Sequence, residues 1–304
     1  MTGGISMQAL AFIVKLRLSR AKRTYADLDE LYASIERSRR TDPARPPARV
    51  RREVSVSCTE VLGRPCYTFA PFARSSGRHV LYFHGGAYVH QIQNDHWWFL
   101  VRLVQRTGCT VTAPIYPLAP AHTCEQTVAM VKEAYDVFLG DRDPDQQVVM
   151  GDSAGAALTL ALAESLEEAG RPQPKELVLI SPWLDVTMTD PVLPELDRRD
   201  PHLAVAGLRE AGWLYAGDRD RRDPVVSPLF GPLSALGRVS VFIGTRDVLL
   251  ADARRLRELA EGRGVPIEYH EYQHMFHVWP IADIPEGRRA AERIAHLVTR
   301  PALS

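Results

Sequence analysis

The five residues from Gly151 to Gly155 read G-D-S-A-G and have the spacing G-x-S-x-G. They directly follow an apolar run at 148–150 and directly precede a stretch of small residues that suits a helix. A serine on a sharp turn between a strand and a helix exposes its hydroxyl, while the glycines let the two elements approach closely and the helix N-terminus directs amides at developing negative charge. The pattern therefore predicts Ser153 as a nucleophile for acyl transfer.

A second motif, H-G-G-A, begins at His84 directly after the apolar run at 80–83. Acyl transfer places negative charge on the former carbonyl oxygen, and removal of one amide that stabilises this charge typically costs about 3 kcal/mol. Glycines leave the backbone accessible for such contacts. We expect the amides of Gly85, Gly86 and Ala154 to form the oxyanion hole.

A serine hydroxyl is a weak nucleophile at neutral pH, so it needs an adjacent base and an acid that orients the base. When the serine lies on such a strand-turn-helix elbow, the acid and then the histidine follow it in the chain, each beyond the end of a strand. Asp247 follows the apolar run at 239–243, and His277 follows the run at 267–269. This order predicts Asp247 as the orienting acid and His277 as the general base.

Both partners have competitors in the sequence. Asp252 lies five residues beyond Asp247, at the expected start of a helix. His274 shares the predicted loop with His277, whereas His270 lies inside the predicted strand. Only a histidine in the loop can reach the serine, and of the two loop histidines we favour His277 over His274.

Apolar runs alternate with helical segments along most of the chain. Such alternation predicts an α/β fold with a mostly parallel central sheet, covered by helices on both faces. A hairpin of two short β-prone runs separated by glycine and proline precedes it. The predicted strands are 54–58, 66–69, 80–83, 110–115, 148–150, 177–180, 239–243 and 267–269, and the predicted helices of the body are 97–105, 123–138, 154–169, 251–261 and 286–298.

Two segments break this alternation. Residues 1–47 carry helical spacing for two helices and end in a proline-rich stretch, which marks a boundary to the body at 48–304. Residues 187–223 are rich in proline and charge, and look like an insertion with one helix near 205–215. No internal repeat is visible.

The composition excludes several classes of partner. Lys plus Arg and Asp plus Glu number 37 each and are scattered, so the sequence predicts no binding to nucleic acid or to an anionic membrane. The apolar stretch at 7–18 is interrupted by Lys15 and Arg17 and is too short to cross a bilayer, so no membrane insertion and a cytoplasmic location are expected.

The four cysteines lack metal-ligand spacing, so the sequence predicts no metal site. Cys58 and Cys66 flank a predicted hairpin turn, and we favour two buried thiols over a disulfide.

Four motifs, H-G-G-A, G-D-S-A-G, G-T-R-D and M-F-H-V, occur between Val80 and Trp279 in the order typical of the hormone-sensitive lipase-like esterases of the α/β-hydrolase superfamily. The chain resembles this family. The resemblance implies a cofactor-free hydrolase of esters with short to medium acyl chains. It assigns the same catalytic and oxyanion residues, makes 1–47 and 187–223 a helical cap, and lets Tyr88 border the substrate pocket.

The sequence departs from the family pattern at two places. Ala121 stands where an acidic residue often follows A-P, and Val278-Trp279 follow His277 where many members have H-G-F. The bulky Trp279 is expected to narrow or line the substrate pocket.

The expected function is two-step hydrolysis of a small, soluble carboxylic ester through an acyl-serine intermediate, rather than action at an oil surface. An amidase, deacetylase or lactonase with the same triad is an alternative, because the motifs barely separate these activities. A non-catalytic binding module of the same fold is a further alternative. The oligomeric state, a homodimer included, is left open.

Overall fold

The computed structural model describes residues 4–40, 44–234 and 236–300. Eight strands form one sheet in the order β1-β2-β4-β3-β5-β6-β7-β8. The hairpin pairs antiparallel with the rest through β2 and β4, and all pairs from β4 to β8 are parallel. The strands are β1 (Ser55–Val61), β2 (Arg64–Ala70), β3 (His79–Phe83), β4 (Thr110–Pro114), β5 (Gln147–Asp152), β6 (Glu176–Ile180), β7 (Arg238–Gly244) and β8 (Ile267–Tyr272). The predicted fold class is confirmed.

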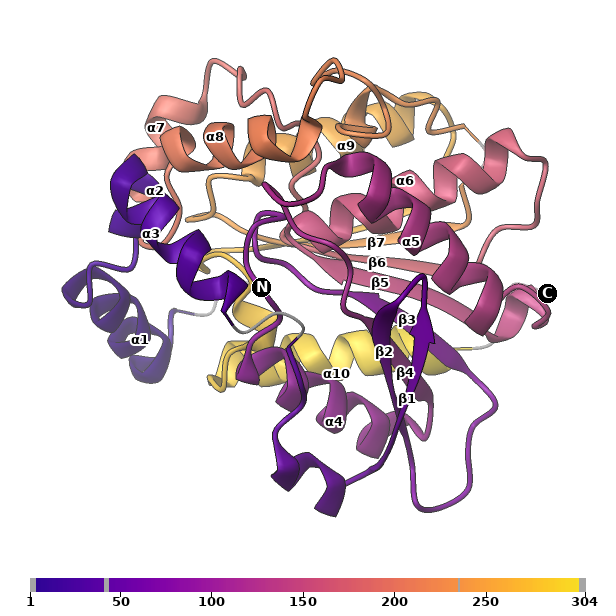
Figure 1. Cartoon of the computed structure of the whole chain (residues 1–304). Coiled ribbons are helices and arrows are strands. Elements are labelled where there is room, and N and C mark those ends of the chain that lie inside the picture. The colour runs from indigo at the N-terminus through magenta and orange to yellow at the C-terminus, as the bar shows by residue number, and fades with distance from the viewer. Residues whose placement is uncertain (1–3, 41–43, 235, 301–304) are drawn as a thin grey trace.

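Helices cover both faces of this sheet (Figure 1). The helices α4 (Asn94–Thr107) and α10 (Pro285–Thr299) pack together on one face, and α5 (Cys124–Phe138) and α6 (Ala154–Glu168) pack together on the other, where α9 (Leu250–Gly262) also lies. Central strands are buried on both sides, which explains why β3, β5 and β6 read as continuous apolar runs rather than as alternating patterns.

The N-terminal helices and the insertion lie together beside the body (Figure 1). The first segment contains α1 (Met7–Leu18), α2 (Arg23–Ala26) and α3 (Leu28–Arg39), and the insertion contains α7 (Leu193–Arg199) and α8 (Val205–Ala216). The described part of the N-terminal segment therefore has three helices where two were predicted, and the insertion has two where one was predicted. The two missed helices are only four and seven residues long, too short for a periodic pattern to be recognised.

Short 3₁₀ turns complete the chain: η1 (Ala48–Arg52), η2 (Pro144–Gln146), η3 (Pro228–Phe230) and η4 (Trp279–Ile281). In the hairpin, Cys58 pairs with Tyr67 and Cys66 with Thr59. Adjacent positions alternate between sheet faces, and Cys58 is exposed while Cys66 is buried. Both thiols are free, as expected. Because Cys58 is exposed, the expectation of a buried thiol is wrong for that residue.

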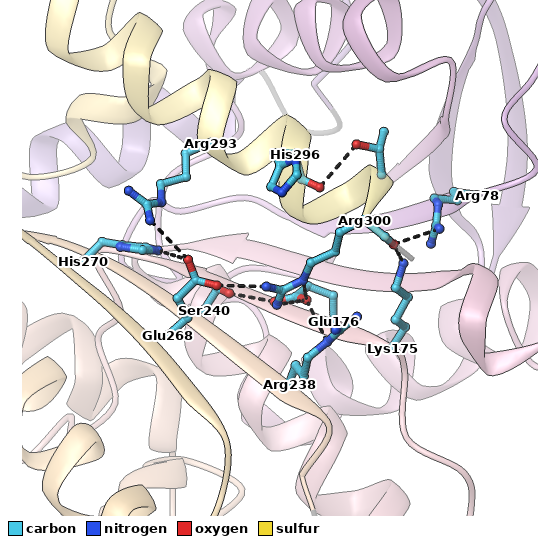
Figure 2. Close-up of polar contacts among 11 residues, drawn as sticks. Arg78, Lys175, Glu176, Arg238, Ser240, Glu268, His270, Arg293, His296 and Arg300 are labelled. Carbon is cyan, nitrogen blue, oxygen red and sulfur yellow. Dashed lines mark hydrogen bonds and ion pairs between the residues drawn. The ribbon is translucent and has the colours of Figure 1, made fainter. Parts of the chain in front are cut away.

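At the amino ends of β6, β7 and β8 an ion-pair network ties α10 to the sheet (Figure 2). The Arg300 guanidinium donates to Glu176 Oε2 at 3.0 Å and to Glu268 Oε2 at 2.8 Å. Arg238 lies 3.6 Å from the same Glu176 oxygen, and Ser240 donates to the other oxygen at 2.7 Å. Every oxygen of the buried Glu176 side chain therefore has a partner.

Candidate active site

Ser153 lies on the turn between β5 and α6, with a backbone φ of 53° and ψ of −119°. A positive φ is strained for a residue with a side chain, so tight packing must hold it there. A Cβ on Gly151 would approach Gly155 O to 2.2 Å, and one on Gly155 would approach Phe83 O to 2.0 Å. Both glycines of the motif are therefore required for the turn that presents Ser153.

Asp247 and His277 meet beyond the carboxyl ends of β7 and β8. The His277 Nδ1 lies 2.9 Å from Asp247 Oδ2, and both side chains are buried. Burial lowers the pKa of His277, but the negative charge of Asp247 and its hydrogen bond outweigh this, so the pKa is raised. With Nδ1–H donated to the carboxylate, the neutral ring carries its lone pair on Nε2.

Ser153 and His277 line one cavity of about 280 Å³. The structure therefore brings the three predicted residues together: the serine and the histidine at the cavity wall, and the aspartate behind the histidine. Acyl transfer by a serine needs an imidazole near the hydroxyl that accepts its proton.

The competing residues lie elsewhere. The Asp252 carboxylate accepts hydrogen bonds from the amides of Leu184 and Asp185, at 2.7 and 3.0 Å, and so anchors the chain after β6. His270 is part of β8, and the exposed His274 does not line the cavity. Neither Asp252 nor these histidines are placed to act on Ser153.

In the glycine loop after β3, the structure differs from the predicted oxyanion hole at one residue, Gly85. The amide of Gly85 donates to Asp152 Oδ1 at 2.9 Å, so it is not available to an oxyanion. The amides of Gly86, Ala87 and Ala154 have no hydrogen-bond acceptor among the residues that the structure describes, and Gly86 and Ala87 line the cavity. The loop turns at Ala87, whose φ is 53°.

Asp152 and His84 hold this loop in place. Asp152 also accepts from the Tyr82 hydroxyl and lies 3.3 Å from His96 Nε2. Burial raises the pKa of Asp152, but His96 and these hydrogen bonds bring it below its usual range. The His84 Nδ1 lies 2.7 Å from the Gly85 carbonyl oxygen, so the ring braces the loop.

The two predicted substrate-binding side chains do not line the cavity. Tyr88 is buried and stacks on Tyr215, with ring centroids 3.6 Å apart, because the turn at Ala87 directs it into the core. Trp279 is fully buried in η4 and packs against Tyr272. In this structure each large ring fills space between elements rather than space in the cavity.

The outer cavity wall comes from the N-terminal helices and the insertion. Phe12 and Leu16 of α1 line it, and Phe12 stacks on Phe276, the neighbour of His277, at 4.9 Å. His202 and Leu203 line it from the insertion. These apolar contributions favour an acyl or alkyl group as the occupant.

Asp200 is a residue of this region that the sequence analysis missed. Its Oδ2 accepts from the Val248 amide at 2.8 Å, and its Oδ1 accepts from the amides of His202 and Leu203 at 2.7 and 2.8 Å. Burial and then the charge of Asp247 raise the pKa of Asp200 above its usual range. Asp200 stands in the insertion, 47 residues before its neighbour Asp247, and no motif marks it.

Among the described residues, no group of three or more His, Cys, Asp or Glu side chains is arranged to hold a metal ion. The groups at the cavity wall include a hydroxyl, an imidazole and backbone amides. Such groups suit acyl transfer by a serine nucleophile.

Comparison with known proteins agrees with this geometry. Residues 80–281 match a family model described as alpha/beta hydrolase fold. An acetyl-hydrolase of Streptomyces hygroscopicus is 36% identical over 77% of this chain and 77% of its own length, and an esterase of Acinetobacter venetianus is 32% identical over 72% and 74%. A solved hormone-sensitive lipase from a metagenome library aligns with a TM-score of 0.83 and 27% identity, over 97% of this chain and 99% of that one. The chain belongs to the α/β-hydrolase fold family and is a carboxylic ester hydrolase of its hormone-sensitive lipase-like branch.

Proposed function

We propose that this enzyme hydrolyses carboxylic esters with Ser153 as nucleophile, His277 as general base and Asp247 as the acid that orients His277. The observation that carries the proposal is the shared cavity, into which a strained serine and an aspartate-paired imidazole both open.

In the first step, Ser153 Oγ attacks the ester carbonyl while His277 Nε2 takes the hydroxyl proton. The tetrahedral oxyanion is stabilised by amides of the glycine loop and the elbow; with the Gly85 amide held by Asp152, the donors are Gly86, Ala87 and Ala154. The alcohol leaves with the proton from His277. Water then attacks the acyl-serine by the same route and releases the acid.

The substrates are small esters with short to medium acyl chains, acetyl esters included. The cavity of about 280 Å³ supports a compact occupant, and one relative is named an acetyl-hydrolase. Amidase, deacetylase and lactonase activities use the same groups, so turnover of matched ester and anilide substrates separates them. Ester turnover well above anilide turnover supports the proposal.

We also propose that 1–47 and 187–223 act together as a cap on the catalytic body at 48–304. The support is the cavity wall, to which Phe12 and Leu203 contribute from the two segments. A Cβ on Gly207 of α8 would come within 2.4 Å of the Tyr25 carbonyl oxygen of α2, so the two segments are closely packed.

No helix within the described ranges is long and apolar enough to cross a membrane. A cytoplasmic location stays a prediction, which cell fractionation tests. A homodimer likewise stays an open prediction, which sedimentation velocity tests.

Replacement Ser153→Ala tests the catalytic proposal. Turnover of p-nitrophenyl butyrate should fall by roughly 10⁴-fold or more, because the acyl-enzyme route is removed. The matched control is Ser165→Ala on the same helix, whose hydroxyl donates to the Leu162 carbonyl oxygen. Unchanged turnover in Ser153→Ala would refute the assignment.

A further inference from the structure

Helix α1 exposes an apolar stripe. Met7, Leu10, Val14 and Leu18 follow one another at spacings of three, four and four residues, which places them on one helix face. Their exposed fractions are 77%, 40%, 44% and 79%. Eleven large hydrophobic side chains are exposed among the described residues, and four of them are on this single helix. Scattered exposed side chains need no explanation, but a contiguous stripe does.

The opposite face of α1 is also apolar. Ala9 and Ile13 are buried, and Phe12 and Leu16 pack on the body and line the active-site cavity. The helix is therefore apolar on two sides, which explains why its sequence shows only modest amphipathicity. A helix with apolar residues all round is normally buried. In α1 the outward side has no protein cover among the described residues.

Basic side chains border the stripe. At 3.6 residues per turn, Lys15 and Arg17 lie on its opposite edges, and Arg20 follows the end of the helix. None of the three forms an ion pair with a described residue, and all three are exposed. The first acidic residue of the chain is Asp27, so nothing on this segment neutralises them.

The charges decide between two occupants of the stripe. Two-fold pairing with a second copy through this face would bring like charges together, which is unfavourable. An anionic lipid surface would accept the apolar side chains among its acyl chains and the basic side chains among its headgroups. A helix of 12 residues is about 18 Å long and too short to span a bilayer.

We propose that the outward face of α1 docks the protein on an anionic membrane surface, with α1 lying in the plane of the interface. This docking does not depend on the catalytic assignment. The inward face of the same helix forms part of the cavity wall, so docking places the active-site cavity next to the lipid. The sequence expectation that no anionic membrane is bound rested on net charge, which is zero only because acidic residues elsewhere balance this segment.

Vesicle flotation tests the proposal with the full chain. Vesicles of equal parts phosphatidylglycerol and phosphatidylcholine should carry the protein to the top of the gradient at low salt, and vesicles of phosphatidylcholine alone should carry much less. Binding to the anionic vesicles should weaken as salt is raised, since screening reduces the attraction.

Two variants probe the two parts of the face. The double variant Leu10→Gln with Leu18→Gln should weaken binding more than tenfold, because both apolar side chains become polar. Arg17→Glu should weaken it by roughly fivefold or more. The matched controls on α5 are Val137→Gln, an exposed apolar side chain, and Lys132→Glu, an exposed basic one; both should bind as the unmodified protein does.

All four variants should keep the thermal midpoint and the turnover of p-nitrophenyl acetate, because none of these side chains lines the cavity. The proposal is overturned if the unmodified protein does not float, or if neutral vesicles bind it equally well. Unchanged binding in the α1 variants would also overturn it. So would a dimer in sedimentation velocity that Leu10→Gln with Leu18→Gln converts to a monomer, since the stripe would then be a subunit interface.

Discussion

At the amino ends of β6 to β8 the buried Glu176 is paired with Arg300 and Arg238. At the carboxyl ends of β5 and β7, by contrast, the buried Asp152 and Asp247 contact backbone amides and histidines. An arginine keeps its charge at any pH that a folded protein tolerates, so the first arrangement is a fixed clamp. An imidazole gains and loses a proton near neutral pH. The same sheet therefore has one end built to hold charge and another built to move a proton.

The largest expected effect at the catalytic end comes from Asp247→Asn. The asparagine leaves His277 without a charged partner and favours the wrong tautomer, so kcat for p-nitrophenyl acetate should fall by roughly 10⁴-fold. The control is Asp283→Asn, whose exposed carboxylate pairs with Arg288 and does not line the cavity. A loss of less than tenfold would mean that Asp247 does not orient the base.

At the opposite end of the sheet, Arg300→Met removes the ion pairs with Glu176 and Glu268. Glu176 keeps Arg238 and Ser240 but loses its closest cation, so the free energy of unfolding should fall by about 3 kcal/mol while kcat stays unchanged. Urea unfolding measures the first and ester turnover the second. Arg289→Met removes an exposed guanidinium 3.6 Å from Glu286, whose carboxylate keeps its hydrogen bonds to Ser6, so stability should change by about 0.5 kcal/mol or less. A drop in kcat without a drop in stability would contradict the division between the two ends.

Asp200→Asn removes a carboxylate that lies close to Asp247 at the catalytic end of the sheet. The carboxylate fixes the Val248 amide beside Asp247, and its charge helps to raise the pKa of His277. Kcat should fall by about tenfold, the size of one hydrogen bond to a charged group. The low-pH limb of the rate profile should also move to lower pH. A loss of stability with an unmoved profile would make Asp200 a purely structural residue.

The smallest expected effect is a shift in the low-pH limb of the rate profile of the unmodified enzyme. His277 must be neutral to accept the serine proton, so kcat/KM should fall as pH decreases through its pKa. Because Asp247 raises this pKa, the limb should lie above 6.5, the usual value for histidine. Rates between pH 5 and 9 check this. A limb well below 6.5 would show that burial, not Asp247, dominates the pKa of His277.

Elements and motifs with a strong local signal were predictable from the sequence. All eight strands lie at the predicted positions, because buried parallel strands read as apolar runs. The elbow at Ser153 was predictable too, since only glycines fit at positions 151 and 155. The order of Asp247 and His277 followed from the chain order of this fold.

Features that depend on tertiary contacts were not predictable. The Gly85 amide donates to Asp152, 67 residues away, and the Tyr88 ring stacks on Tyr215 of the insertion. Asp200 gains its position only when the insertion folds against the loop after β7. In each case the residue that fixes the position of the group is distant in sequence, so no local pattern predicts the contact.

Ser153 is the proposed nucleophile, and covalent trapping of its hydroxyl is a direct test of that role. A fluorophosphonate should add one label to the protein, and mass spectrometry of the digested chain should place that label on the peptide containing Ser153. Labelling should be abolished in Ser153→Ala and strongly slowed in Asp247→Asn. A label on a different residue, or full labelling of Ser153→Ala, would show that Ser153 is not the nucleophile.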